Sequence, residues 1–122
     1  NQFELELLTG AAARDAAGIV AAAKIVGERG CPRVIATGCT LSDTAPGQVE
    51  TVLCAGDDLH RIATPRLPIR PCGTGDLLAG LVAAHLARGL RVEEALRRAV
   101  DGTFAVLERT QAAASEEMCL VG

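Results

Sequence analysis

Four residues at positions 73–76, Gly-Thr-Gly-Asp, are the sharpest chemical feature of the sequence. They stand directly before a run of apolar residues at helical spacing that extends to about Arg88. Two glycines let backbone N–H groups approach an anion closely, and the first turn of a helix adds N–H donors and the positive end of its dipole. The pattern suits a transferring phosphoryl group, with Asp76 placed to accept a proton from an attacking hydroxyl.

A purely structural interpretation of the same four residues competes with this chemistry. Glycines are common in turns before helices, and an acidic residue in a first turn complements the helix dipole. A Walker A loop is excluded because no Gly-Lys-Ser/Thr is present. A Rossmann site is disfavoured because Leu78 stands at the third glycine position of GxGxxG. By itself, the tetrapeptide is more often structural than catalytic.

Three segments read together resemble pyridoxal kinases of the ribokinase-like superfamily. Residues 1–10, NQFELELLTG, are similar to the N-x-F-E-x-E-x-L-T-G signature of that family. Residues 73–80, GTGDLLAG, are similar to its GTGDL helix start. Residues 106–110, VLERT, followed by SEE at 115–117 and the apolar residues 119–121, are similar to its C-terminal end. Order and intervals agree over essentially the whole chain.

The resemblance implies ATP-dependent phosphorylation of the 5′-hydroxyl of pyridoxal, pyridoxine or pyridoxamine, which is vitamin B6 salvage to pyridoxal 5′-phosphate. Asp76 falls on the catalytic base of the family, which also contacts the substrate. Gly73, Thr74 and Gly75 fall on its anion hole. The resemblance implies ATP and Mg²⁺ as cofactors and is compatible with a K⁺ requirement, although no residue of this chain points to K⁺.

Other site residues are also implied by the resemblance. Asn1 and Glu4 fall on an N-x-x-E element that organises Mg²⁺ and the phosphates, largely through water, and on a helix they would share a face. Thr37 matches a position that touches the nucleotide phosphates, although the family usually has serine at the next position, where this chain has glycine. Arg66 and Leu67 fall near a loop that flanks the nucleotide. By itself, Glu4 is more often a solvated carboxylate.

The elements that must position these residues form an α/β pattern. Residues 1–8 fit either a strand or a short helix, and their spacing does not decide between the two. Asp15 can cap a helix that runs to Arg29, with Gly30 as its C-terminal glycine. Residues 33–37 are short and apolar, as in a buried strand. This order of helix, tight turn and strand is typical of the α/β crossover connections found in parallel sheets.

The second half of the chain is predicted to contain a hairpin and two helices. The hairpin pairs strands 49–55 and 59–63 through a Gly-Asp-Asp turn. A proline-containing connector, a helix from Gly73 to about Arg88, a helix from residue 92 or 93 to about 113, and a terminal strand at 118–121 follow. The apolar face of the last helix is predicted to carry Ala95, Leu96, Ala99, Val100, Phe104 and Leu107.

The resemblance implies the C-terminal part of a ribokinase-like three-layer α/β/α fold, with a mainly parallel sheet and an antiparallel hairpin. Residues 1–122 would be the nucleotide-binding and catalytic-loop portion of a pyridoxal kinase-like domain whose N-terminal half is absent. In the family that half supplies the vitamin-binding residues. We therefore expect the native protein to be longer and this chain alone to be inactive.

The composition narrows the range of partners. The chain has 122 residues, is 49% hydrophobic and carries a net charge of −3, as expected of a folded domain that binds neither nucleic acid nor an anionic membrane. Five scattered cysteines without a CxxC favour a reducing cytoplasm over a disulfide framework. The expected partner is a small-molecule B6 vitamer, and the resemblance implies a homodimer.

Three alternatives stay open at this point. Hydroxymethylpyrimidine kinases share the fold but usually have cysteine where this chain has Asp76. Sugar kinases of the ribokinase type prefer D-T-x-G-A-G-D, which residues 70–72 do not supply. A truncated, non-catalytic nucleotide-binding module is the third, and Asp76 speaks against it because a structural role would tolerate asparagine or alanine there.

Overall fold

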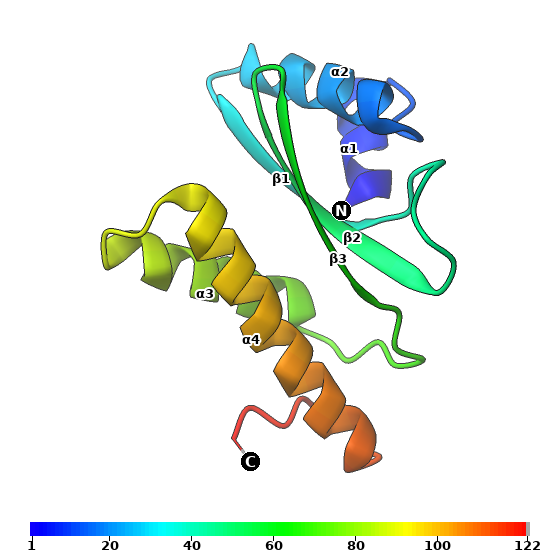
Figure 1. Ribbon diagram of the computed structural model, residues 1–122, viewed down its shortest axis with the longest axis vertical. Helices are drawn as coiled ribbons and strands as arrows, with labels where there is room; N and C mark the ends of the chain where they lie inside the picture. The colour runs from blue at the N-terminus through cyan, green and yellow to red at the C-terminus, as the bar shows by residue number, and fades with distance from the viewer. Residues whose placement is uncertain (122) are drawn as a thin grey trace. The chain divides into compact units, whose positions relative to one another are not determined.

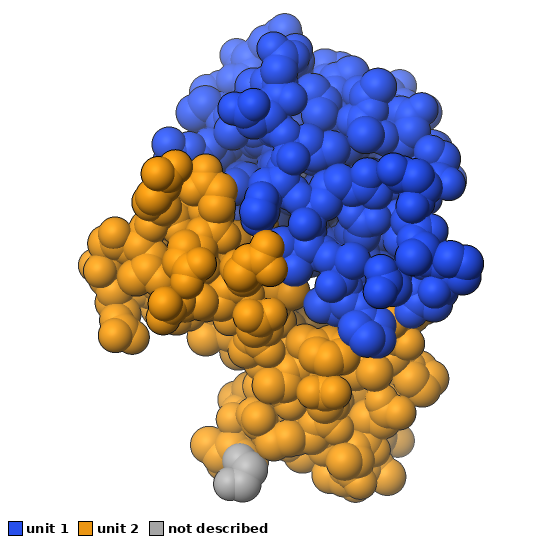
Figure 2. Space-filling view, viewed as in Figure 1, with its two compact units in different colours: residues 1–65 blue, residues 66–122 orange. Residues whose placement is uncertain are grey.

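A computed structural model of the chain describes residues 1–121 (Figure 1). The chain divides into two compact units, residues 1–65 and 66–122, which we call unit 1 and unit 2 and which Figure 2 colours separately. Unit 1 contains α1 (Gln2–Thr9), α2 (Ala16–Gly27), β1 (Arg33–Cys39), β2 (Gln48–Ala55) and β3 (Asp58–Pro65). Unit 2 contains α3 (Thr74–Ala87) and α4 (Val92–Ala112).

The sheet of unit 1 has three strands in the order β1-β2-β3, and both pairings are antiparallel. The predicted hairpin is confirmed: β2 and β3 pair from Ala55 opposite Asp58, across a turn in which Gly56 has a φ of 62°. The parallel pairing expected of the larger fold does not occur among residues 1–121. Parallel neighbours need a crossover connection, and here no helix stands between one strand and the next.

Residues 1–8, which fit either a strand or a helix, form helix α1. A capping box at the first residue explains the choice: the Asn1 side chain accepts a hydrogen bond from the Glu4 N–H at 2.9 Å, and the Glu4 carboxylate accepts one from the Asn1 nitrogen at 2.6 Å. Gly10, at φ 68°, ends the helix. Only Leu5 of α1 is buried, whereas Phe3 is 70% exposed. The alternating apolar pattern of this segment is therefore not a strand pattern.

Helix α2 starts as predicted and ends earlier than predicted. Asp15 caps it by accepting a hydrogen bond from the Gly18 N–H at 2.7 Å. The helix stops at Gly27, because Arg29 and Gly30 close tighter turns, in which Arg29 donates to the Val26 carbonyl and Gly30 to the Gly27 carbonyl, both at 3.0 Å. Gly30 then has a φ of 102° outside the helix.

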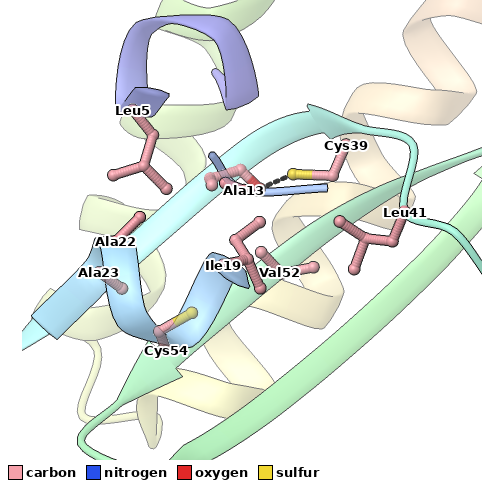
Figure 3. Close-up of a cluster of buried hydrophobic side chains, with 10 residues drawn as sticks. Leu5, Ala13, Ile19, Ala22, Ala23, Cys39, Leu41, Val52 and Cys54 are labelled. Atoms are coloured by element: carbon pink, nitrogen blue, oxygen red, sulfur yellow. Dashed lines mark hydrogen bonds between the residues drawn. The ribbon is translucent and has the colours of Figure 1, made fainter. Parts of the chain in front are cut away.

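The core of unit 1 lies between the two helices and the sheet (Figure 3). Ile19 and Ala22 of α2 pack there with Val52 of β2, and all three are fully buried. Full burial of a side chain such as Ile19 or Val52 stabilises a fold by about 1.5–3 kcal/mol. The remaining buried members are Leu5, Ala13, Ala23, Ala36, Cys39, Leu41 and Cys54.

Unit 2 is built on the pair α3 and α4. Leu78 and Val82 are the buried residues of α3. Gly102 of α4 allows Leu81 of α3 to approach closely, because a Cβ added to Gly102 would lie 3.3 Å from the Leu81 Cδ1 atom. Of the face predicted for α4, Phe104 and Leu107 are only half-buried. The buried residues of α4 are Ala95, Leu96, Ala99, Val100, Thr103, Val106 and Thr110. Two of them are threonines, whose burial the apolar spacing did not predict.

The terminal strand predicted at 118–121 is wrong. Residues 118–121 are irregular, and α4 side chains occupy their backbone groups. Thr110 accepts a hydrogen bond from the Cys119 N–H, and Arg109 donates to the carbonyls of Cys119 and Leu120. A strand would need those groups for a neighbouring strand.

Candidate functional site

The glycine loop, residues 73–76, lies at the start of α3. Gly73 is the N-cap at φ 85°, and the first helical hydrogen bond runs from the Leu77 N–H to its carbonyl at 2.9 Å. The first four N–H groups of any helix have no partner within the helix. In the described chain, the side chains of Asn1 and Asp15 cap α1 and α2, whereas neither α3 nor α4 has a side-chain cap. No side chain therefore takes up the first N–H groups of α3, and what sets this turn apart from that of α4 is its pair of glycines and Asp76.

The two glycines of the loop differ in what their surroundings demand. Gly73 has a left-handed backbone, and a Cβ on it would lie 3.1 Å from the Met118 Cε atom. Gly75 has neither constraint: its backbone is not left-handed, and a Cβ on it would meet nothing within 4 Å. The chain's own packing therefore explains Gly73 but not Gly75. Open space over Gly75 permits close approach of a ligand to the backbone, but Gly27 and Gly80 have the same open space, so it supports an anion site only in combination with the uncapped turn and Asp76.

Asp76 stands in the first turn of α3 and is exposed. Thr74, the residue immediately before Gly75, is half-buried, and its hydroxyl donates to the Pro71 carbonyl at 3.0 Å. One helical turn thus carries the uncapped N–H donors and a solvent-accessible carboxylate. Chemically, this arrangement can hold an anion and accept a proton beside it.

Asn1 and Glu4 lie together at the start of α1, as the N-x-x-E spacing predicts. Their side chains form the capping box described above, and the Glu4 side chain is 63% exposed. The Asn1 oxygen is engaged by the Glu4 N–H. The Glu4 carboxylate, which accepts from the Asn1 nitrogen at 2.6 Å but is 63% exposed, is the group of this pair that a hydrated cation would meet. Among residues 1–121 no group of three or more His, Cys, Asp or Glu side chains is arranged to hold a metal ion.

Thr37 stands in a β-bulge of β1. Ala36 pairs with Val52 and Cys39 with Glu50, so Thr37 and Gly38 together oppose one residue of β2. Gly38 adopts the left-handed φ of 63° that such a bulge needs. The glycine that departs from the family pattern therefore has a backbone reason. A bulge interrupts the ladder and redirects the side chains beside it.

Gln2 is a residue that the sequence analysis missed. Its side chain donates to the Ala13 carbonyl at 2.6 Å and accepts from the Thr40 N–H at 2.9 Å. These bonds tie the start of α1, with Asn1 and Glu4, to the chain just beyond the bulge that carries Thr37. A glutamine inside a short helix gives no sequence signal for a bond to a residue 38 positions away.

An ion-pair network centred on the buried Glu50, also missed, links β2 and β3 to the loop before β2. Glu50 is only 4% exposed, and Arg61 donates to both of its carboxylate oxygens at 2.7 Å. Arg61 also contacts Asp43 at 2.8 and 2.9 Å, and the Thr44 hydroxyl donates to Glu50 at 2.7 Å. The Arg61 guanidinium lowers the pKa of the Glu50 carboxyl despite its burial. The network joins the loop after the bulge to both strands of the hairpin.

The predicted residues fall into two groups. Asn1, Glu4 and Thr37 belong to unit 1, and the glycine loop belongs to unit 2. Arg66, which is exposed, and Leu67, which is half-buried, directly follow β3 and also belong to unit 2. In the described chain, no helix is both long and apolar enough to cross a bilayer.

Comparison with curated proteins and solved structures confirms the resemblance to pyridoxal kinases. The chain is 36% identical over 122 residues to pyridoxal kinase PdxY of Rubrobacter xylanophilus, covering 99% of this chain and 42% of that protein. It therefore spans less than half of this relative. Its structure is similar to pyridoxal kinase from Entamoeba histolytica, with a TM-score of 0.84 and 22% identity over 98% of this chain and 42% of that one.

A second solved structure, pyridoxal kinase from Leishmania donovani in complex with ADP and pyridoxine, matches with a TM-score of 0.79 and 23% identity over 98% of this chain and 41% of that one. These neighbours have the ribokinase-like fold, which confirms the predicted α/β class. The family model described as phosphomethylpyrimidine kinase matches residues 1–118. The chain belongs to the phosphomethylpyrimidine kinase family.

Proposed function

We propose that the protein transfers the γ-phosphoryl group of ATP to the 5′-hydroxyl of pyridoxal, pyridoxine or pyridoxamine. The observation that carries the proposal is the first turn of α3, where uncapped N–H donors, an unobstructed Gly75 and the exposed Asp76 occupy one helical turn. The names of the relatives, pyridoxal kinases, supply the substrate class. Residues 1–122 would form the nucleotide-binding and catalytic-loop portion of the enzyme.

In this mechanism the N–H groups of Thr74, Gly75 and Asp76 hold the transferring phosphoryl group and the negative charge that builds on it. The hydroxyl oxygen of the vitamer forms a bond to the γ-phosphorus, and the bond from that phosphorus to the β-phosphate oxygen breaks. The hydroxyl proton passes to the Asp76 carboxylate. Donors fixed before the reaction need no reorganisation as the charge develops, which is the source of their catalytic value.

The residues of unit 1 would serve the nucleotide side of the reaction. Glu4 would hold Mg²⁺ through water, and its exposed carboxylate fits a cation that keeps most of its hydration shell. Mg²⁺ bound there would neutralise charge on the phosphates. Thr37, at the bulge, would contact the phosphates, and Arg66 and Leu67 would flank the nucleotide. Assembly as a homodimer and a cytoplasmic location are part of the same proposal.

The decisive experiment is an ATP-dependent assay of the full-length protein with each B6 vitamer, for wild type and Asp76→Asn. Loss of the general base should lower kcat by roughly 10²–10⁴-fold. Affinity for ATP should stay within several-fold, because asparagine leaves the backbone donors in place. An unchanged kcat in the variant would remove Asp76 from the reaction.

A second candidate, phosphorylation of a hydroxymethylpyrimidine, is favoured by the description of the matching family model. The same assay with hydroxymethylpyrimidine in place of the vitamer separates the two substrates by their kcat/KM values. Nucleotide binding with no turnover of either substrate would instead identify a non-catalytic binding module.

A further inference from the structure

The segment after α4 returns to the start of α3 within unit 2. Ala114 has a left-handed φ of 47°, and Ser115 donates from its N–H to the Thr110 carbonyl at 3.2 Å, so the chain reverses at the end of the helix. The Ser115 hydroxyl accepts the Glu117 N–H at 3.1 Å and donates to the Glu117 carbonyl at 2.7 Å, which closes the turn. Residues 118–120 then run beside α4 rather than away from it.

Two α4 side chains fix the backbone of this segment. The Thr110 hydroxyl, fully buried, donates to the Val106 carbonyl at 2.8 Å and accepts the Cys119 N–H at 3.0 Å. Arg109 donates to the carbonyls of Cys119 and Leu120 at 3.3 and 3.2 Å. The residues around Met118 are therefore held by side chains of a long, well-packed helix. The position of Met118 is therefore set by residues outside the glycine loop.

The Met118 side chain packs on the glycine loop. Its Cε atom lies 3.1 Å from where a Cβ on Gly73 would be, and its sulfur lies 4.0 Å from the Thr74 hydroxyl, within reach of a weak O–H···S contact. Gly73 and Thr74 are the residues at which the chain turns into α3. Met118 thus supports the turn that aims the first N–H groups of the helix.

We propose that Met118 is a positioning residue for the anion-binding loop, an inference that rests on the function proposed above. No side chain caps α3 within the described residues, and Gly73 and Gly75 are intrinsically flexible, so the loop has little else to restrain it. Donors that stabilise a transition state act through their fixed direction. The flexible thioether side chain of methionine is well suited to fill an irregular gap beside a glycine. Removing the Met118 side chain would leave the turn unsupported.

The test is Met118→Ala in the full-length protein, with two companion variants. We expect kcat to fall roughly tenfold, since small displacements of catalytic groups have effects up to about 10²-fold, while the KM for the vitamer stays within about twofold. Met118→Leu conserves volume and should restore kcat to within about threefold of wild type. Leu120→Ala is the matched control, because that side chain, in the same segment, is 57% exposed and should not affect kcat.

Amide hydrogen exchange gives a readout that is independent of turnover. Exchange at the Leu77 N–H, which donates to the Gly73 carbonyl at 2.9 Å and so reports opening of the turn, should be several-fold faster in Met118→Ala than in wild type or Leu120→Ala, with α4 unchanged. Met118→Val, a milder truncation, gives the same comparison should the alanine variant fail to fold. Equal exchange in the truncated and wild-type proteins overturns the inference. Wild-type protein without kinase activity overturns the proposed function instead, and the exchange result still decides the role of Met118.

Discussion

Replacing Gly75 with alanine should stabilise the fold and damage the activity. Gly75 is the second residue of α3, its backbone is not left-handed, and an added Cβ would meet no atom within 4 Å. Alanine is favoured over glycine within a helix by about 0.5–1 kcal/mol, largely because it restricts the unfolded chain. The methyl group would, however, project into the space that the phosphoryl group is proposed to occupy.

The expected magnitudes follow from this geometry. In the full-length protein, which the activity assay requires, a gain of about 0.5–1 kcal/mol raises the melting temperature by roughly 1–4 °C. The loss of close approach to the N–H donors should lower kcat/KM for ATP at least tenfold, given that loss of one such donor costs about 10²–10³-fold in kcat. Gly73→Ala should instead destabilise the fold. The backbone φ of Gly73 is 85° and Met118 would have to move, so the free energy of unfolding should fall by about 1–2 kcal/mol.

Thermal unfolding and steady-state kinetics on the same preparations test the prediction. Gly27→Ala is the matched control, because that glycine ends α2, also has open space around a Cβ, and lies outside the proposed site. It should raise stability without changing kcat/KM. Should Gly75→Ala be as active as wild type, the open space over Gly75 has no ligand and the argument for an anion site at this turn fails.

Three further predictions concern unit 1. Glu4→Gln keeps the capping box, since glutamine serves at that position, yet should raise the Mg²⁺ requirement several-fold more than the vitamer KM; the reverse pattern would assign Glu4 to the substrate side. The lowered pKa of Glu50, caused first by the Arg61 hydrogen bond, stabilises the fold above the ordinary value of 4.5, and this stability is lost as the pH falls through the folded-state pKa. Urea unfolding from pH 6 to 3 should therefore show a steeper loss in wild type than in Glu50→Gln, and equal slopes would contradict the role of the pair. Burial raises the pKa of the Cys39 thiol to about 11, a stabilising contribution that is complete below pH 9.0 and lost as the pH rises through 11. At pH 8 a thiol reagent should label the exposed Cys72 rapidly and Cys39 only on unfolding, and equal rates would refute the burial argument.

Several features could be predicted from the sequence because they depend on residues within about four positions. The glycine loop and Asp76 share one helical turn whatever the rest of the chain does. Asp15 caps α2 through a residue three positions away, and the hairpin between β2 and β3 follows from its turn residues. Local backbone preference and short-range hydrogen bonds suffice for such elements.

Other features were decided only by tertiary packing. Residues 1–8 fit two periodicities, and the burial of Leu5 alone among the residues of α1 is a result of packing, whereas the capping box of Asn1 and Glu4 is a local signal that the sequence analysis did not use. The terminal strand was wrong because side chains of α4 take the hydrogen bonds that a strand would use. Apolar spacing reports which residues can be buried, but not which partner their backbone will find.

The proposed catalytic turn can be recognised in the sequence, whereas its supports are a property of the fold. Asp76 and its glycines are contiguous, and their pattern together with the resemblance to pyridoxal kinases predicts proton transfer beside a bound anion. Met118 reaches Thr74 across 44 positions, and Gln2 reaches Thr40 across 38. Contacts over such separations depend on how whole elements pack, which no local preference encodes. For that reason the sequence by itself determined which contiguous residues the proposed chemistry would use, and only the tertiary structure decided which residues hold them in place.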